Sequence, residues 1–237
     1  MIRLDFMAKK AKHVHEMFSS IAQRYDLLNT LLSLNRDKHW RRFAVEQSGL
    51  APSGTALDVA TGTGELAIEL AKAVGPEGKV VGVDFCKEML DIAGEKCRGL
   101  CIELAEGNAR ELPYPDGTFD SATIGFALRN VESIEKTLGE MARVVKPGGR
   151  VISLEFTQPD NRLFRRLYYV YFFKILPIVG GIISRNKEAY SYLPGSVARF
   201  PGKMELKEIM EKAGLEDIEI YPLTGGIAAV HVGVKPT

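Results

Sequence analysis

The stretch Asp58-Val59-Ala60-Thr61-Gly62-Thr63-Gly64 decides the fold of this chain. It ends a short strand-like run that begins near residue 55, and a helical pattern starts directly after it. The two glycines allow a tight turn and let a ligand come close to the backbone. A strand, a glycine-rich turn and a helix in this order predict a nucleotide-binding loop at the carboxyl end of a strand.

The charges around this turn indicate which nucleotide it binds. Gly62-x-Gly64-x-x-Ala67 also fits the dinucleotide fingerprint, so NAD is an alternative ligand. However, Asp58 precedes the turn and Glu65 follows it, whereas a pyrophosphate is favoured at a helix N-terminus that is free of anions. S-adenosylmethionine has no phosphate and carries an ammonium and a sulfonium group, which carboxylates favour. The turn therefore predicts S-adenosylmethionine as the ligand.

Asp84 is the second acidic residue of the predicted site. It ends the next strand-like run, 20 residues after Gly64, where an acid can bind the two hydroxyls of a ribose. The structural alternative is that Asp84 caps a helix that begins near Lys87. The upstream glycine turn favours the ribose interpretation.

Composition excludes several other classes of protein. The 237 residues contain 31 basic and 30 acidic side chains. The chain therefore lacks the excess of basic residues that would indicate a nucleic-acid partner. Three clustered cysteines, Cys86, Cys97 and Cys101, predict free thiols in a reducing compartment, not a disulfide framework or a zinc site. The charged first twelve residues contain no apolar signal-peptide core, so we expect a cytoplasmic protein, with Met1 or Met7 as its start.

Strand-like and helical patterns alternate from residue 55 to residue 156. We expect strands at about 55–59, 79–84, 101–105, 119–126 and 150–156, and helices at about 64–74, 87–98 and 132–145. This alternation predicts a mainly parallel sheet with helices on both faces, and ligands at the carboxyl ends of its strands. Lys146-Pro147-Gly148-Gly149 is typical of a tight turn before a strand.

The rest of the chain predicts additions to one domain that spans residues 1–237. Residues 1–49 are expected to form an N-terminal helical cover with an amphipathic helix at about 10–33, and residues 50–157 the ligand-binding core. Residues 203–237 predict a helix at about 203–213 and a hairpin of two strands, at about 216–222 and 226–235. Between them, residues 158–202 break the alternation and are interpreted as an insertion that covers a substrate.

This insertion is basic and aromatic, and an apolar run from Ile175 to Ile183 follows. The run is too short and too interrupted for a transmembrane helix, which needs about 20 mostly apolar residues. Basic and aromatic side chains in one segment also favour peripheral contact with a membrane, which is compatible with a substrate cover.

Further motifs carry a resemblance to a known family. Asp58-x-x-x-Gly62-x-Gly64, Asp84, Asn108-Ala109, Phe119-Asp120 and Lys146-Pro147-Gly148-Gly149 resemble the ordered motifs of Rossmann-like methyltransferases. Residues 25–29, 125–131, 143–157, 192–194 and 223–226 are similar to signatures of the UbiE/MenG/COQ5 quinone C-methyltransferases. The resemblance extends over roughly residues 9–236, which is nearly the whole chain.

The resemblance implies a class I fold, with a mainly parallel seven-stranded sheet and a C-terminal antiparallel hairpin. It implies S-adenosylmethionine as the methyl donor and no metal. The cofactor-binding residues that it implies are Asp58, Gly62, Thr63, Gly64, Asp84, Asn108, Ala109 and Gly125. Asn108 and Ala109 are expected to contact the adenine. The chain departs from the family pattern at Asp37, Gly125 and Gly195, so no side-chain role is assigned there.

Arg129 and Asn130 are the predicted catalytic residues. Arginine is effectively never deprotonated, so Arg129 is not expected to act as a base. It could instead stabilise an oxyanion that develops on a quinol, while Asn130 orients the ring or a water molecule. The structural alternative is an ion pair of Arg129 with Glu132 or Glu135. His39 and His231 are weaker candidates for a base.

The function that the resemblance implies is C-methylation of a reduced polyprenyl quinone precursor. Demethylmenaquinol is favoured over a demethylated ubiquinol precursor, a 2-polyprenyl-6-methoxy-benzoquinol. A methyltransferase for another lipid or small phenol is one alternative, and a non-enzymatic module of a biosynthetic complex is another. Peripheral contact with the inner face of a membrane, a homodimer and a quinone-biosynthesis complex are left open as partners.

Overall fold

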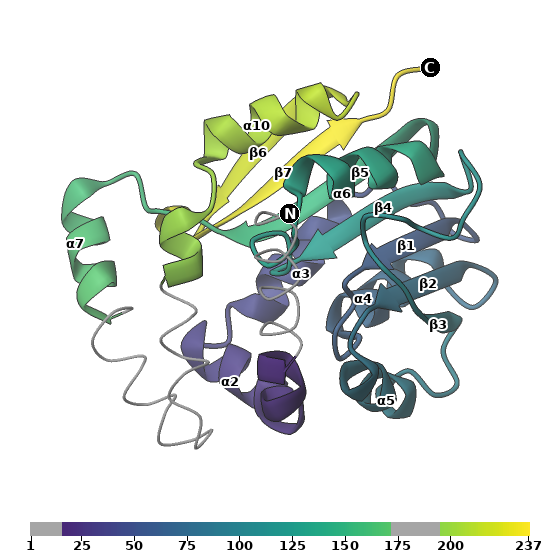
Figure 1. Cartoon of the computed structure of the whole chain (residues 1–237), viewed down its shortest axis with the longest axis horizontal. Helices are drawn as coiled ribbons and strands as arrows, with labels where there is room; N and C mark the ends of the chain where they lie inside the picture. The colour runs from purple at the N-terminus through teal and green to yellow at the C-terminus, as the bar shows by residue number, and fades with distance from the viewer. Residues whose placement is uncertain (1–15, 172–194) are drawn as a thin grey trace, which may run out of the picture.

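The structure is a computed structural model, and it describes residues 16–171 and 195–237. Its centre is a seven-stranded sheet with the order β3-β2-β1-β4-β5-β7-β6 (Figure 1). The strands are β1 (Thr55–Val59), β2 (Lys79–Asp84), β3 (Ile102–Glu106), β4 (Phe119–Gly125), β5 (Val145–Phe156), β6 (Glu216–Leu223) and β7 (Ala228–Val234). Neighbours from β3 to β5 pair in parallel, and β7 pairs antiparallel with both β5 and β6. The predicted parallel sheet with a C-terminal hairpin is confirmed.

Helices cover both faces of the sheet. α4 (Glu65–Val74) follows β1 directly and buries its apolar stripe with Val45 of α3 (Asp37–Glu46). α3 also packs Trp40 on residues of β5 and β7. On the opposite face, α6 (Ile134–Val144) packs on β4 and β5, and α10 (Lys203–Lys212) packs on β6, β7 and α6. α5 (Lys87–Lys96) lies beside β2 and β3. This layering brings the carboxyl ends of β1, β2 and β4 to one edge of the sheet (Figure 1).

The N-terminal cover differs from the single helix that the sequence predicts. Residues 16–21 are helical, a 3-10 turn follows at η1 (Ala22–Arg24), and α2 (Tyr25–Leu32) continues after it. The amphipathic period carries on across the turn, which is why the sequence does not show this break. The remaining part of the predicted helix, residues 10–15 with His13 and His15, lies outside the described residues.

The predicted turn at residues 146–149 lies inside a strand. Val145 pairs with Phe119 and Arg150 pairs with Ser121, so four residues of β5 stand opposite the single residue Asp120 of β4. Gly148 adopts the left-handed conformation, with φ 76°. A side chain at Gly149 would place its Cβ 2.5 Å from the Asp120 carbonyl oxygen. The glycines are therefore required by a bulge, which a sequence cannot readily distinguish from a turn.

The insertion between β5 and α10 begins with α7 (Arg162–Val170), which projects away from the sheet (Figure 1). Residues 172–194 lie outside the described part of the chain. They include the apolar run from Ile175 to Ile183 and the motif at 192–194. Among the helices that the structure describes, none is long and apolar enough to cross a membrane.

Candidate active site

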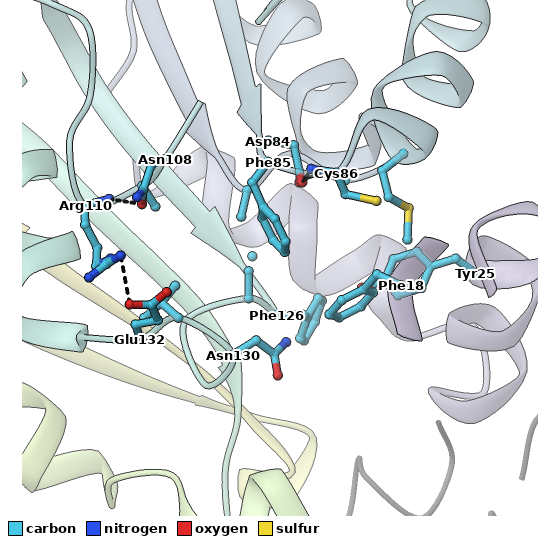
Figure 2. Close-up of a pocket in the computed structure, with 17 residues that line it drawn as sticks. Phe18, Tyr25, Asp84, Phe85, Cys86, Asn108, Arg110, Phe126, Asn130 and Glu132 are labelled. Atoms are coloured by element: carbon cyan, nitrogen blue, oxygen red, sulfur yellow. Dashed lines mark hydrogen bonds and ion pairs between the residues drawn. The ribbon is translucent and has the colours of Figure 1, made fainter. Parts of the chain in front are cut away.

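A cavity of about 290 Å³ lies at the carboxyl ends of β1, β2 and β4 (Figure 2). Its lining combines a few polar groups with many apolar side chains, as is typical of ligand sites. The lining residues are Phe18, Tyr25, Ala60, Gly62, Asp84, Phe85, Cys86, Met89, Asn108, Ala109, Arg110, Gly125, Phe126, Ala127, Asn130, Val131 and Glu132. Gly62, Asp84, Asn108, Ala109, Gly125 and Asn130 are thus brought together, as the sequence predicts.

The glycine turn forms one wall of this cavity. Gly62 and Gly64 both have positive φ, 57° and 83°, in the region that favours glycine. A Cβ on Gly64 would lie 2.9 Å from the Cys97 Sγ, so this position also has little room for a side chain. Ala60 takes a positive φ of 54° as well, and strained non-glycine residues of this kind cluster at ligand sites.

Asp84 ties the glycine turn to the end of β2. Its Oδ2 accepts a hydrogen bond from the Gly62 amide at 2.8 Å, and its Oδ1 accepts one from the Cys86 amide at 2.9 Å. The N-cap position of α5 is Cys86, and no side chain caps this helix. The alternative that Asp84 caps α5 is therefore wrong, and its carboxylate lies at the cavity instead.

Asp58 and Thr63 line a smaller cavity of about 30 Å³, which adjoins the first and shares Ala60, Gly62 and Gly125 with it. Asp58 is buried and accepts hydrogen bonds from the hydroxyls of Thr61 and Thr123 at 2.7 and 2.8 Å. Burial raises the pKa of Asp58 to about 6, because desolvation disfavours the charged form. The Thr63 hydroxyl donates to Asp26 at 2.6 Å and is thus engaged by the N-terminal cover.

Asn108, Ala109 and Gly125 complete the predicted cofactor set. The Asn108 Oδ1 accepts from the Arg110 amide at 3.0 Å, which fixes the turn after β3. Gly125 lines both cavities. A Cβ at this position would lie 3.0 Å from the Leu66 side chain, which gives a packing reason for glycine there.

Arg129 and Asn130 face different surroundings. Asn130 lines the 290 Å³ cavity together with Asp84, whereas Arg129 lines a third cavity of about 440 Å³. The Arg129 guanidinium pairs with the buried Glu155 at 2.5 Å, so the structural alternative of an ion pair with Glu132 or Glu135 is wrong. Glu132 pairs with Arg110 at 2.8 Å (Figure 2).

The same guanidinium holds the turn between β4 and α6. One guanidinium nitrogen of Arg129 donates to the Phe126 carbonyl at 2.5 Å. The guanidinium carbon lies 5.5 Å from the centre of the Phe156 ring. Phe126 has a positive φ of 56°, which is a strained conformation for a bulky residue. The buried pair of Arg129 and Glu155 thus supports a strained turn that carries Phe126 and Asn130 into the cavity.

The sequence analysis missed the aromatic side chains of the site. Phe18 and Tyr25 come from the N-terminal cover, and Phe85 and Phe126 come from strand ends (Figure 2). Three of them had a signal, because Tyr25 and Phe126 stand in family signatures and Phe85 follows Asp84 directly. The histidines lie elsewhere: His39 is exposed, and His231 is buried with its Nε2 3.0 Å from the Lys203 carbonyl oxygen.

These residues fit S-adenosylmethionine. Two carboxylates suit its cationic amino acid part and its ribose diol, and an apolar aromatic lining next to an amide suits a purine. Within residues 16–171 and 195–237, no group of three or more His, Cys, Asp or Glu side chains is placed to hold a metal ion.

The mostly parallel sheet with its antiparallel β7, the glycine turn after β1 and the acid at the end of β2 fit the predicted class I methyltransferase fold. A structure named as a SAM-dependent methyltransferase from Aquifex aeolicus has the same fold, with a TM-score of 0.62 and 22% sequence identity. The match covers 88% of this chain and 96% of that one. It confirms the predicted fold class.

The model of the ubiE/COQ5 methyltransferase family matches residues 6–235, and the chain belongs to this family. It is 46% identical to the demethylmenaquinone methyltransferase of Bacillus cytotoxicus, over 96% of this chain and 97% of that protein. It is 42% identical to the protein of the same name from Shouchella clausii, over 96% and 98%. The chain is thus an S-adenosylmethionine-dependent methyltransferase, which confirms the predicted family, activity and cofactor.

Proposed function

We propose that this methyltransferase transfers a methyl group to a ring carbon of demethylmenaquinol, in menaquinone biosynthesis. The observation that carries the proposal is the similarity of 46% identity over nearly the full length to a demethylmenaquinone methyltransferase. The cavity supports it, because Phe18, Tyr25, Phe85 and Phe126 offer aromatic surface to a flat ring.

The cofactor roles follow from the geometry of the glycine turn. We assign Asp84 to the ribose diol and Asp58 to the side of the cationic amino acid part. Gly62, Thr63 and Gly64 shape the turn, Asn108 and Ala109 face the adenine, and Gly125 leaves room beside Leu66. When it is bound, the sulfonium supplies an electrophilic methyl group.

The chain has to make a quinol carbon nucleophilic. A phenol-like hydroxyl has a pKa near ~10, and its ionised form pushes electron density onto the ring. Asn130 lines the cavity and can donate from its amide to the developing oxyanion. The oxyanion role predicted for Arg129 is proposed in a modified form: Arg129 positions Asn130 from behind, because its own charge is set against Glu155.

The segments outside the cofactor-binding core are assigned to covering the substrate or completing the sheet. We propose that residues 50–157 hold the cofactor, that residues 1–49 and 158–202 cover the quinol, and that residues 203–237 complete the sheet. In α7, Leu163 is 72% exposed and Val170 is 47% exposed, beside the basic Arg162 and Arg166. Exposed apolar and basic side chains on one helix favour peripheral contact with a membrane.

The test is methyl transfer by the purified protein, with S-adenosylmethionine and one of two quinols. Short-tailed demethylmenaquinol and a demethylated benzoquinol precursor are each reduced chemically before use, and the products are identified by mass spectrometry. We expect one methyl group on the naphthoquinol ring. Transfer to the benzoquinol alone, or to neither quinol while the cofactor still binds, would refute the choice of acceptor.

A further inference from the structure

The cofactor cavity is roofed by the N-terminal segment of residues 16–32, called the cover segment below. Phe18 and Tyr25 line the cavity from this segment, with their rings 5.9 Å apart in an edge-to-face contact. Phe18 also packs with Cys86 and Met89, which belong to the other wall (Figure 2). A ligand that occupies the cavity therefore lies under the cover segment.

One polar side chain of the cover segment bonds directly to the glycine turn. The two carboxylate oxygens of Asp26 accept from the Thr63 hydroxyl at 2.6 Å and from the Lys96 ammonium at 2.9 Å. Lys96 also pairs with Glu65, the first residue of α4. The cover segment, the glycine turn and α5 are thus joined through one carboxylate.

The bond to Thr63 is the better sheltered of the two. The side chains of Asp26 and Lys96 are 36% and 27% exposed, so water screens their charge pair and its contribution is small. Thr63, in contrast, is only 2% exposed. A threonine hydroxyl has a single proton to donate, and here it points to the cover segment. Thr63 therefore contributes to the glycine turn by holding Asp26 of the cover segment.

The other end of the cover segment is fixed to the body of the protein. Leu34 and Asn35 have positive φ angles of 52° and 62°, so the chain reverses sharply between α2 and α3. Next to this bend, the buried Asp37 accepts from the Ser33 hydroxyl at 2.7 Å and pairs with Arg41 at 2.5 Å. The segment is thus anchored at one end and held at the cavity by Asp26.

We propose that Asp26 is a positioning residue that latches the cover segment to the glycine turn and so retains the cofactor during turnover. A cofactor has to pass this roof when it enters and leaves. The segment can swing about residues 33–36 once the bonds of Asp26 and the hydrogen bond of the Ser19 hydroxyl to Glu88, at 2.9 Å, are released. The bonds of the latch join Asp26 to Thr63 of the glycine turn and to Lys96 of α5, so the latch can be tested without a methyl acceptor.

The test compares Asp26→Ala and Thr63→Val with an Asp91→Asn control. Asp91 and Lys87 form an exposed ion pair on α5, the helix that also carries Lys96. This pair does not involve the glycine turn. Cofactor affinity and release are measured with S-adenosylhomocysteine by calorimetry and stopped flow, without any quinol. Loss of a hydrogen bond to a charged group predicts about tenfold weaker binding of the ligand by Asp26→Ala, mainly through faster release. The control should bind as the unaltered protein does.

Three further readouts separate a latch from a general loss of stability. The double variant Asp26→Ala with Thr63→Val should bind no more weakly than Asp26→Ala alone, because both changes remove the same bond. Hydrogen exchange of residues 16–32 in the presence of ligand should rise in Asp26→Ala, while that of β1 and β4 stays unchanged. In the methyltransfer assay, KM for S-adenosylmethionine should rise more than kcat falls.

Binding within twofold of the unaltered protein in both single variants would overturn the proposal. Additive losses in the double variant, or exchange that rises equally in β1 and β4, would also overturn it. If Asp26→Ala does not fold, Thr63→Val decides, since it removes the sheltered bond and leaves all charges in place. Because no quinol is present in the binding assays, failure of the proposed acceptor does not affect the result.

Discussion

Replacing Arg129 by methionine tests the buried ion pair behind the cavity. Glu155 is fully buried, and Arg129 has a side chain that is only 7% exposed. Glu155 Oε1 accepts from the guanidinium at 2.5 Å and from the Phe156 amide at 2.9 Å, and Oε2 accepts from the Arg129 amide at 3.2 Å. Arg129→Met would leave this carboxylate with two backbone amides and no cation.

Loss of one partner of a buried pair costs about 3–5 kcal/mol, because the remaining charge stays desolvated. That is a large part of the roughly 5–15 kcal/mol by which domains are stable. We expect urea unfolding of Arg129→Met to show a loss of this size. The double variant Arg129→Met with Glu155→Gln should recover much of it, because it buries no unpaired charge.

Activity separates the two roles that are open to Arg129. A residue that positions Asn130 should lower kcat by about 10²-fold when it is lost, on the scale of one oxyanion donor, with little change in cofactor affinity. Glu155→Gln should lower kcat as well, because the same turn loosens. A kcat that is unchanged in Glu155→Gln but lost in Arg129→Met would indicate that the arginine charge acts alone. Stability within about 1 kcal/mol of the unaltered protein would refute the reasoning about burial.

Three further predictions concern single side chains. Asp84→Ala should weaken S-adenosylmethionine binding by about 1–3 kcal/mol in calorimetry, since it removes a buried acceptor, and unchanged affinity would exclude the ribose role. Burial raises the pKa of Asp58 to about 6 in the free protein, so its charge is lost as the pH falls below this value. Cofactor affinity should therefore fall with pH below about 6, up to tenfold per unit, and an Asp58→Asn variant should lack this dependence. Burial lowers the pKa of His231 to about 4, whereas the unfolded chain takes up this proton near pH 6.5. The stability that neutral His231 contributes should thus fall by about 3 kcal/mol from pH 7 to pH 4, measured as the difference in unfolding free energy between the unaltered protein and His231→Phe.

The fold was predictable because its signals are local and repeated. The run from Thr55 to Val59 is buried on both faces of a sheet, so its apolar residues stand together, and the glycine turn follows within three residues. β2 and β4 are likewise mostly buried runs that precede a helix, α5 and α6. The ends of strands were less predictable where tertiary contacts decide them. At Lys146–Gly149, for example, pairing of β5 with β4 makes a bulge of the residues that were predicted as a turn.

The cofactor side of the site was predictable for a related reason. In a parallel sheet, the carboxyl ends of successive strands meet at one edge, so Asp84, Asn108 and Gly125 could be brought together from their positions in the alternation alone. The cover segment gave only a partial signal. Tyr25 belongs to a motif, but its helical period is the same whether the segment packs on the core or over a ligand, so Phe18 looks like any core residue.

The partner of Arg129 could not be predicted because it depends on the register of β5. Glu155 lies 26 residues after Arg129, on β5. In the sequence, this acid within an apolar run makes the strand look partly exposed. Glu132 and Glu135 are nearer along the chain, but Glu132 bonds to Arg110 instead. Sequence distance favours such local pairs, whereas burial favours the distant one, because a desolvated guanidinium needs a carboxylate in the same dry environment. A lone acid in a predicted central strand, opposite a basic residue in a loop at that strand's end, is therefore a better sign of a buried pair than any neighbour along the chain.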